Sequence, residues 1–479
     1  MTAVGRPSSI EIQPTALDLL RLPLLGSFLR WRWGRLAAQL VLLLGTALIV
    51  YDGLTGPQLA PRNLATVLAW VHYRGLVLLA LLLVGNLFCF ACPFTLPRTL
   101  ARRLSIDGRR WPRALRNKWV SIGGLLLIFF LYEWLDLWAS PWLTAWVALA
   151  YFVGSFALEA VFKESAFCKY VCPLGAFNFV YSTASPFQIT ARDQAVCRSC
   201  PGKECLNGSD QVLGCGTELF VPTIDSNMDC TFCLDCARAC PYDNVALARR
   251  PAWQELVAKL PARWDLIFLL TTMAFFGFFN AFGMVPPVYA LQRWMTTSVG
   301  IQSVALQVGL IYAAGAIVLP GLLLTLTAVL SRRARPPERR GTLVQQAARF
   351  APAFVPMGAG IWLAHYGFHF IIGAATLVPV AQSFLIDHGL TWLGGRANWT
   401  VGFLVPVDLI LPLQVGALML GLLAALAVVA RQGLASGDRP LSALLQLLPW
   451  ALVLTGLTIA SLAVFNLPME MRGALAAVP

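Results

Sequence analysis

Long apolar segments separated by basic loops constrain the fold of this chain more than any other feature. Inside a bilayer the backbone must satisfy its own hydrogen bonds, so apolar segments of about 20 residues predict membrane-spanning helices. With 58% hydrophobic and 12% charged residues and a mean hydropathy of +0.69, the 479-residue chain is not composed like a soluble enzyme. The pattern predicts a polytopic α-helical membrane protein with about nine transmembrane helices, at about residues 36–51, 69–90, 119–137, 143–162, 266–285, 304–330, 353–377, 413–431 and 441–465.

Basic residues mark the loops that we expect to stay in the cytoplasm. Arginine and lysine are concentrated at residues 98–118 and 332–340, between predicted spans. The basic residues behind the net charge of +13 are therefore expected to set the orientation of the chain in the membrane and to contact acidic lipids. We expect no nucleic-acid partner. The sequence predicts a multi-pass protein of the bacterial cytoplasmic (inner) membrane, with its N-terminus inside and its C-terminus outside. Tyr132, Glu133 and Trp134, which close the third span, are expected to form an outer interfacial belt.

A run of four cysteines near the middle of the chain predicts an iron–sulfur site. Cys230, Cys233, Cys236 and Cys240 have the spacing C-x2-C-x2-C-x3-C, and Pro241 follows them. This spacing is typical of bacterial-type ferredoxins, in which three thiolates bind one [4Fe–4S] cluster and the fourth binds a second cluster. Zinc sites more often have two separated C-x2-C pairs. All 12 cysteines lie between residues 89 and 240, which favours metal ligands in a reducing compartment over scattered disulfides.

Four cysteines upstream of this run complete a set of eight: Cys197, Cys200, Cys205 and Cys215. In two-cluster ferredoxins, each group of three receives its fourth ligand from the other group. The predicted ligands of the first cluster are Cys197, Cys200, Cys205 and Cys240. The predicted ligands of the second cluster are Cys215, Cys230, Cys233 and Cys236. The alternative is a single cluster with spare thiols.

Two more cysteine pairs lie where predicted spans reach the cytoplasmic face. Cys89 and Cys92 end the second span, Cys168 and Cys172 follow the fourth, and a proline comes directly after each pair. Proline limits the helix and leaves backbone amides free to bond sulfur. Two inward-running helices place these thiols at one depth, so the four cysteines are a candidate site for a further Fe–S cluster or a metal ion. The alternative is that they are buried as small apolar residues.

These motifs divide the chain into four predicted parts. Residues 1–34 form a cytoplasmic N-terminal lead, and residues 35–186 form a four-helix membrane domain with the two Cys-Pro pairs at its cytoplasmic face. Residues 187–248 form an inserted cytoplasmic ferredoxin-like domain with two [4Fe–4S] clusters. Residues 249–479 form a five-helix C-terminal membrane domain.

The order of the motifs resembles the membrane polyferredoxins of the NapH and NosR type. The resemblance covers about residues 75–245, and it rests on the pair Cys168-x3-Cys172 with Pro173 and Gly175, on Cys89, Cys92 and Pro93, and on the eight later cysteines. The first pair here is C-x2-C-P where the family usually has C-x3-C-P. The resemblance implies electron transfer between a membrane or cytoplasmic donor and a respiratory partner.

Histidines are the most informative residues of the remaining membrane segments. His72 and Arg74 open the second span, and His365 and His369 lie four residues apart on one face of the seventh. Because ionisable residues within a span are costly without a partner, these four are a candidate haem b or quinone site, for example with His72 and His369 as a haem pair. The alternative is that they hydrogen-bond neighbouring helices. Two residues near the C-terminal end are candidate soft-metal ligands: Met469 and Met471.

Together these features predict a membrane-bound iron–sulfur electron-transfer protein, acting as a subunit of an oxidoreductase complex. It would relay electrons between a cytoplasmic reductase or ferredoxin and a membrane quinone, a haem or a periplasmic or membrane respiratory subunit. The competing hypothesis is an assembly or metal-handling factor that reduces or holds copper or iron for a respiratory metalloenzyme. A redox sensor is less consistent with the sequence, because no signalling output domain is recognisable after the spans.

Overall fold

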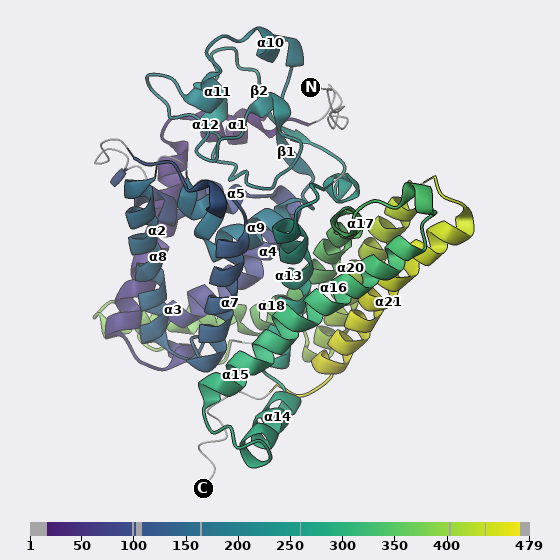
Figure 1. The fold of residues 1–479 in the computed structure, drawn as a ribbon. Helices are drawn as coiled ribbons and strands as arrows, with labels where there is room; N and C mark the ends of the chain where they lie inside the picture. Colours follow the sequence, from purple (N-terminus) through teal and green to yellow (C-terminus); the bar gives the residue numbers. More distant parts are fainter. Residues whose placement is uncertain are drawn as a thin grey trace. The chain divides into compact units, whose positions relative to one another are not determined.

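The computed structural model describes residues 17–97, 100–101, 108–162, 165–258, 260–401, 404–435 and 437–469 (Figure 1). The chain is mostly helical, as predicted. Within these residues, eight helical segments are long and apolar enough to cross a membrane: Gly34–Thr55, Leu64–Val84, Pro141–Val161, Trp264–Phe282, Val304–Arg333, Leu343–Asp387, Val407–Leu434 and Pro440–Phe465. These lengths are those of a multi-pass membrane protein.

The predicted third span is shorter than the others. Helix α7 covers Trp119–Trp134, 16 residues, and a turn at residues 135–139 ends it, where Asp136 has a φ of +47°. A non-glycine residue in this region of φ terminates a right-handed helix. The expected interfacial belt at this end is corrected in part. Tyr132 and Glu133 are buried, at 3% and 2% exposure, because they face other helices of the protein, whereas Trp134 is exposed.

The predicted seventh span is the middle of a longer helical run. It consists of α17 (Leu343–Phe350), α18 (Phe354–Gly373) and α19 (Leu377–Asp387), separated by short 3₁₀ turns. Helix α18 packs against α20 (Ile410–Leu434), and at one point of this crossing the two backbones are in direct contact. A Cβ on Gly360 would lie 2.7 Å from the carbonyl oxygen of Ala417, so the crossing requires glycine there.

The chain forms two compact units. Unit 1 contains Met1–Ala47, Leu79–Ser121 and Val147–Lys259, and unit 2 contains Leu48–Leu78, Ile122–Trp146 and Leu260–Pro479. All twelve cysteines belong to unit 1, and all four histidines belong to unit 2.

A small sheet holds the cysteine-rich part of unit 1. Strands β1 (Phe187–Ala191) and β2 (Val245–Arg249) pair antiparallel, with Ile189 opposite Leu247. Between them the chain forms three short helices, α10 (Gln194–Ser199), α11 (Glu204–Asn207) and α12 (Asp235–Ala239). Leu20, which precedes helix α1 (Pro23–Arg30), is fully buried in the same core as Ile189 and Leu247. The N-terminal segment is therefore part of this core.

Candidate functional site

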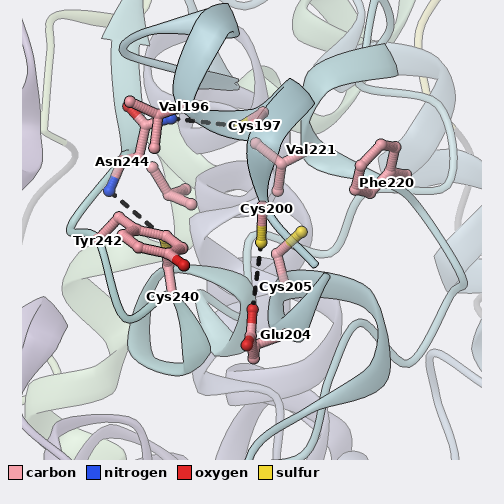
Figure 2. A pocket seen from close by; sticks show the side chains of 11 residues that line it. Val196, Cys197, Cys200, Glu204, Cys205, Phe220, Val221, Cys240, Tyr242 and Asn244 are labelled. Atoms are coloured by element: carbon pink, nitrogen blue, oxygen red, sulfur yellow. Dashed lines mark hydrogen bonds between the residues drawn. The ribbon is translucent and has the colours of Figure 1, made fainter. Parts of the chain in front are cut away.

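Four cysteines of unit 1 surround a first cavity. Cys197, Cys200, Cys205 and Cys240 line about 340 Å³ of space, part of it open to solvent (Figure 2). They come from α10, from the loop that follows it, from α11 and from the residue after α12. The Asn244 side chain donates to the Cys197 sulfur at 3.2 Å, and its backbone N–H donates to the Cys240 sulfur at 3.4 Å. These are the four cysteines that the crossing rule assigns to one cluster.

A second cavity is lined by the other four ferredoxin-type cysteines: Cys215, Cys230, Cys233 and Cys236. Left-handed backbone at Phe232 (φ +49°) and Leu234 (φ +60°) turns the chain sharply between these cysteines. The turns direct the Phe232 amide toward the Cys230 sulfur, and the Leu219 amide donates to the Cys215 sulfur at 3.3 Å. Such strained, amide-rich turns are typical of functional sites that bind anionic groups.

The two cavities offer four thiol donors each. Among the described residues, no group of three or more Cys, His, Asp or Glu side chains could hold one metal ion. In a [4Fe–4S] cube each thiolate binds a different iron, so its sulfurs lie farther apart than the ligands of one zinc ion. Four cysteines line each cavity, and N–H groups are directed at sulfurs in both.

Burial keeps the thiols of Cys230, Cys233 and Cys236 protonated when no metal is bound. It raises the pKa of Cys233 to about 11, and it raises the pKa of Cys230 and Cys236 well above the ordinary value. A reactive thiol needs a lowered pKa, because the thiolate is the nucleophile. The raised pKa values of these three cysteines therefore argue against a thiol–disulfide catalyst. A metal bound there would deprotonate them.

The four membrane-edge cysteines also lie in unit 1. Cys89 is in α5 (Leu87–Ala91), Cys168 lies in the π-helical turn Phe167–Val171, and Cys172 caps α9 (Pro173–Ser182). Cys92 is close enough to Cys89 and Cys172 for electrostatic interaction between the thiols, and Cys172 interacts in the same way with Cys89. Three of the four are thus mutual neighbours, and Cys168 shares the neighbour Arg35 with Cys92.

Polar N–H groups are directed at the membrane-edge sulfurs. The Asn178 side chain donates to the Cys89 sulfur at 3.3 Å, and the Gly175 amide donates to the Cys172 sulfur at 3.2 Å. Burial nevertheless raises the pKa of Cys89 to about 11 and that of Cys172 to about 12. These thiols too would stay protonated without a bound cation.

Replacing Gly175 by alanine is expected to disturb this site specifically. A Cβ there would lie 2.8 Å from the Cys168 carbonyl oxygen and 3.3 Å from Cβ of Cys172, so the two cysteine segments would have to separate. We expect a cost of about 1–3 kcal/mol and loss of any metal held at the membrane edge. Metal analysis of the purified chain measures this, with Gly154→Ala as control, because a Cβ at Gly154 meets only an ordinary contact at 3.6 Å. Unchanged metal content in G175A would contradict the shared site.

Two residues link the membrane-edge cysteines to the second cavity. Asn86 is fully buried; its amide nitrogen donates to the Cys230 carbonyl at 2.6 Å, and its oxygen lies 3.9 Å from the Cys89 sulfur. Arg35 forms an ion pair with Asp235 at 3.0 Å, and it interacts electrostatically with Cys233 on one side and Cys92 on the other. Both residues therefore lie between the two groups of cysteines.

Arg35→Gln is expected to lower the reduction potential of a cluster in the second cavity. The Arg35 side chain is only 17% exposed, so its positive charge stabilises added negative charge nearby with little screening. Removing it should lower the potential by about 50 mV, measured by redox titration of the EPR signal. Arg32→Gln, at an exposed position above the Trp33 ring, is the matched control and should leave the potential unchanged. A potential that rises in R35Q would contradict the placement.

Unit 2 brings two of the four predicted intramembrane residues into direct contact. Nε2 of His365 and Nε2 of His369 lie 3.2 Å apart on α18. His72 does not join them, because its two ring nitrogens lie 2.9 and 3.0 Å from the carbonyl oxygens of Val67 and Ala374. The pair His72 and His369 is thus not brought together as haem ligands. Met469 is half-buried, and Met471 lies outside the described residues.

Arg74 lies close to the histidine pair in a cage of aromatic rings. Its guanidinium lies 4.6 Å from the Tyr132 ring centre and 4.5 Å from that of Tyr366, and it donates to the Tyr132 hydroxyl. Glu133, the residue after Tyr132, accepts from Asn280 at 3.1 Å. Sequence reasoning missed Tyr366 and Asn280 and placed Glu133 at the surface. The available signals were the carboxylate of Glu133 and the amide of Asn280, because polar groups within apolar segments usually have a partner or a function.

Comparison with known proteins does not place the chain in a family. No family model matches it, and neither a curated protein nor a solved structure does.

Proposed function

We propose that this protein is a membrane-bound iron–sulfur electron-transfer protein. The observation that carries the proposal is the grouping of eight cysteines around two cavities in unit 1, four at each, with amide and side-chain N–H groups directed at their sulfurs. Clusters held there would accept and donate single electrons. The protein itself would be an electron-transfer subunit of an oxidoreductase complex.

The positions of the three groups of cysteines support a route for electrons through unit 1. The first and second cavities are joined by the backbone hydrogen bond from Cys215 to the Cys205 carbonyl, 3.1 Å, and by helix α12 between Cys236 and Cys240. Asn86 joins the second cavity to the membrane-edge cysteines. We propose that the membrane-edge cysteines hold a third redox centre or metal, and that electrons pass along this series.

For each end of this electron route we propose a class of redox partner. A cytoplasmic reductase or ferredoxin would exchange electrons at the first cavity, which is partly open to solvent. The other end would be a quinone, a haem or a periplasmic or membrane respiratory subunit. We place the protein in the bacterial inner membrane with its N-terminus and the cysteine-rich part of unit 1 facing the cytoplasm, on the basis of the basic loops.

A metal-handling or assembly factor is the second candidate. The observation that favours it is the proximity of Cys89, Cys92 and Cys172, whose thiols interact electrostatically. A soft cation such as Cu(I) can be held by only two thiolates, so it would not need a group of three ligands around one ion. In that case the membrane-edge site would take up copper, and the two cavities would serve to keep it reduced.

Low-temperature EPR of the full chain, purified without oxygen, distinguishes the two. The electron-transfer proposal expects about eight iron atoms and eight sulfides per chain in the two cavities, and a spectrum of two interacting reduced clusters. Full-length C197S/C233S, in which both cavities lose a ligand, is the control and should lose both signals. Absence of cluster iron, together with copper bound by the full chain and lost in C92S, would overturn the proposal in favour of the second candidate.

A further inference from the structure

The His365–His369 pair has one polar atom that nothing among the described residues satisfies. His365 is fully buried, and its Nδ1 has no hydrogen-bond partner there. In the bond between the two Nε2 atoms one ring donates and the other accepts, so a pair that takes up one extra proton can carry it on either ring. A buried polar atom without a partner is unfavourable. Nδ1 of His365 is therefore available to a partner that binds beside the pair.

The surroundings of the pair make its charge sensitive to an added electron. Arg74 carries a positive charge near both histidines, and this charge opposes a second cation on the pair. Glu133, the nearby carboxylate, interacts with the Tyr366 ring that borders Arg74. Negative charge that arrives at an acceptor beside the pair would offset the repulsion by Arg74, so a proton would then be bound more readily.

The geometry of the pair does not suit two histidine ligands of one haem. Two axial ligands of a haem approach the iron from opposite faces, whereas His365 and His369 lie on one helix with their Nε2 atoms directed at each other. The ring nitrogens of His72 lie near two carbonyl oxygens, and those of His388 lie near one carbonyl oxygen and the Tyr51 hydroxyl. The pair is suited instead to an acceptor that takes a hydrogen bond and a proton.

We propose that His365 and His369 are the proton donor for a quinone-class acceptor bound in unit 2; this rests on the proposed electron-transfer function. In the direction of reduction, one electron enters the quinone carbonyl and the pair takes up one proton from water. The N–H bond of His369 then breaks as the quinone O–H bond forms, and the pair returns to its neutral state. A second electron and a second proton follow the same route. His369, which is half-buried, contacts the quinone, and His365 holds the proton behind it.

The test uses the full chain in lipid nanodiscs with a short-chain benzoquinone. Reduced clusters are mixed with the quinone, and their reoxidation is followed by visible absorbance between pH 6 and 8. His369→Gln keeps a hydrogen-bond donor but cannot carry the proton. We expect it to slow reoxidation by about 10²-fold or more and to lose the pH dependence. His388→Gln, outside the pair, should behave like the wild type. Reoxidation by ferricyanide, which takes an electron without a proton, should be unchanged in all variants.

A second readout needs no electron transfer. Binding of the oxidised quinone, followed by quenching of tryptophan fluorescence, should weaken about 5- to 10-fold in His369→Phe, which removes the ring nitrogens, and stay near wild type in His369→Gln. If wild-type protein holds clusters and reduces the quinone, but H369Q does so equally fast, the inference is wrong and the proposed function stands. A haem absorption band in the purified protein that is lost in H369F would also overturn the inference. Clusters absent from the wild type would refute the proposed function itself.

Discussion

Replacing Cys240 by serine is expected to remove the cluster of the first cavity and leave that of the second. Cys240 belongs in sequence to the run that begins at Cys230, but its side chain lines the cavity of Cys197, Cys200 and Cys205. Loss of one of four thiolates should release that cluster, so the iron content should fall by about four atoms per chain. Iron analysis and low-temperature EPR measure this, since the interaction between two reduced clusters would disappear and the spectrum of one would remain.

Double variants test the assignment of Cys240 more sharply than the single one. C197S/C240S should lose no more iron than C240S, because both cysteines serve one cluster, whereas C233S/C240S should lose both clusters. Tyr242→Phe is the matched control, because Tyr242 lines the same cavity without offering a thiolate. Iron lost only from the site of Cys233 in C240S would show that the grouping of the cysteines is wrong.

Arg250→Met is expected to destabilise unit 1 by about 3–5 kcal/mol. The Arg250 side chain is fully buried; it pairs with Glu255 at 2.8 Å and donates to the carbonyl oxygens of Thr183 and Ser185 and to Gln188. It thereby ties the end of α9 to both strands of the small sheet. Methionine fills a similar volume but leaves Glu255 as a buried charge without its cation. Thermal unfolding of the full chain in detergent, followed by circular dichroism, measures the loss.

The effect of R250M should depend on pH with a definite sign. Burial raises the pKa of Glu255 even beside Arg250, so the folded state binds a proton at this carboxyl more tightly than the unfolded state. This group therefore favours folding most below its unfolded pKa, and that advantage is lost as the pH rises through the folded pKa. Because protonated Glu255 needs no counter-charge, the loss in R250M should shrink as the pH falls from 7 toward about 5.

Two variants complete the experiment on Arg250. Arg249→Met changes the neighbouring, exposed arginine and should cost less than about 0.5 kcal/mol. R250M/E255Q should recover part of the stability, because a neutral amide replaces the stranded carboxylate. A loss in R250M that grows toward acid pH would contradict the role assigned to Glu255.

The cysteine groups show how far sequence reasoning reaches for the candidate site. The spacing from Cys230 to Cys240 predicts which thiols share a cluster. Cysteines within one short loop are positioned by the backbone of that loop, so their spacing in the sequence is enough. Cys205 and Cys215 have looser spacing, and yet they line the two cavities to which the crossing rule assigns them. Whether clusters bind there stays a prediction. The N–H donors to these sulfurs, such as Asn244, were not predicted, since an asparagine carries no distinctive local pattern.

The membrane segments were predicted from the sequence alone, because the hydropathy of about 20 consecutive residues decides whether a helix can cross a bilayer. Their exact ends were not, as the turn at Asp136 and the 3₁₀ turns around α18 show. The tertiary structure alone decided which distant side chains meet: Asn86 with Cys230, Arg35 with Asp235, and Arg74 with Tyr366. It also paired His365 with His369 and turned His72 toward backbone carbonyls. Such contacts depend on how helices far apart in the chain pack and rotate against one another, and no local pattern of residues encodes that rotation.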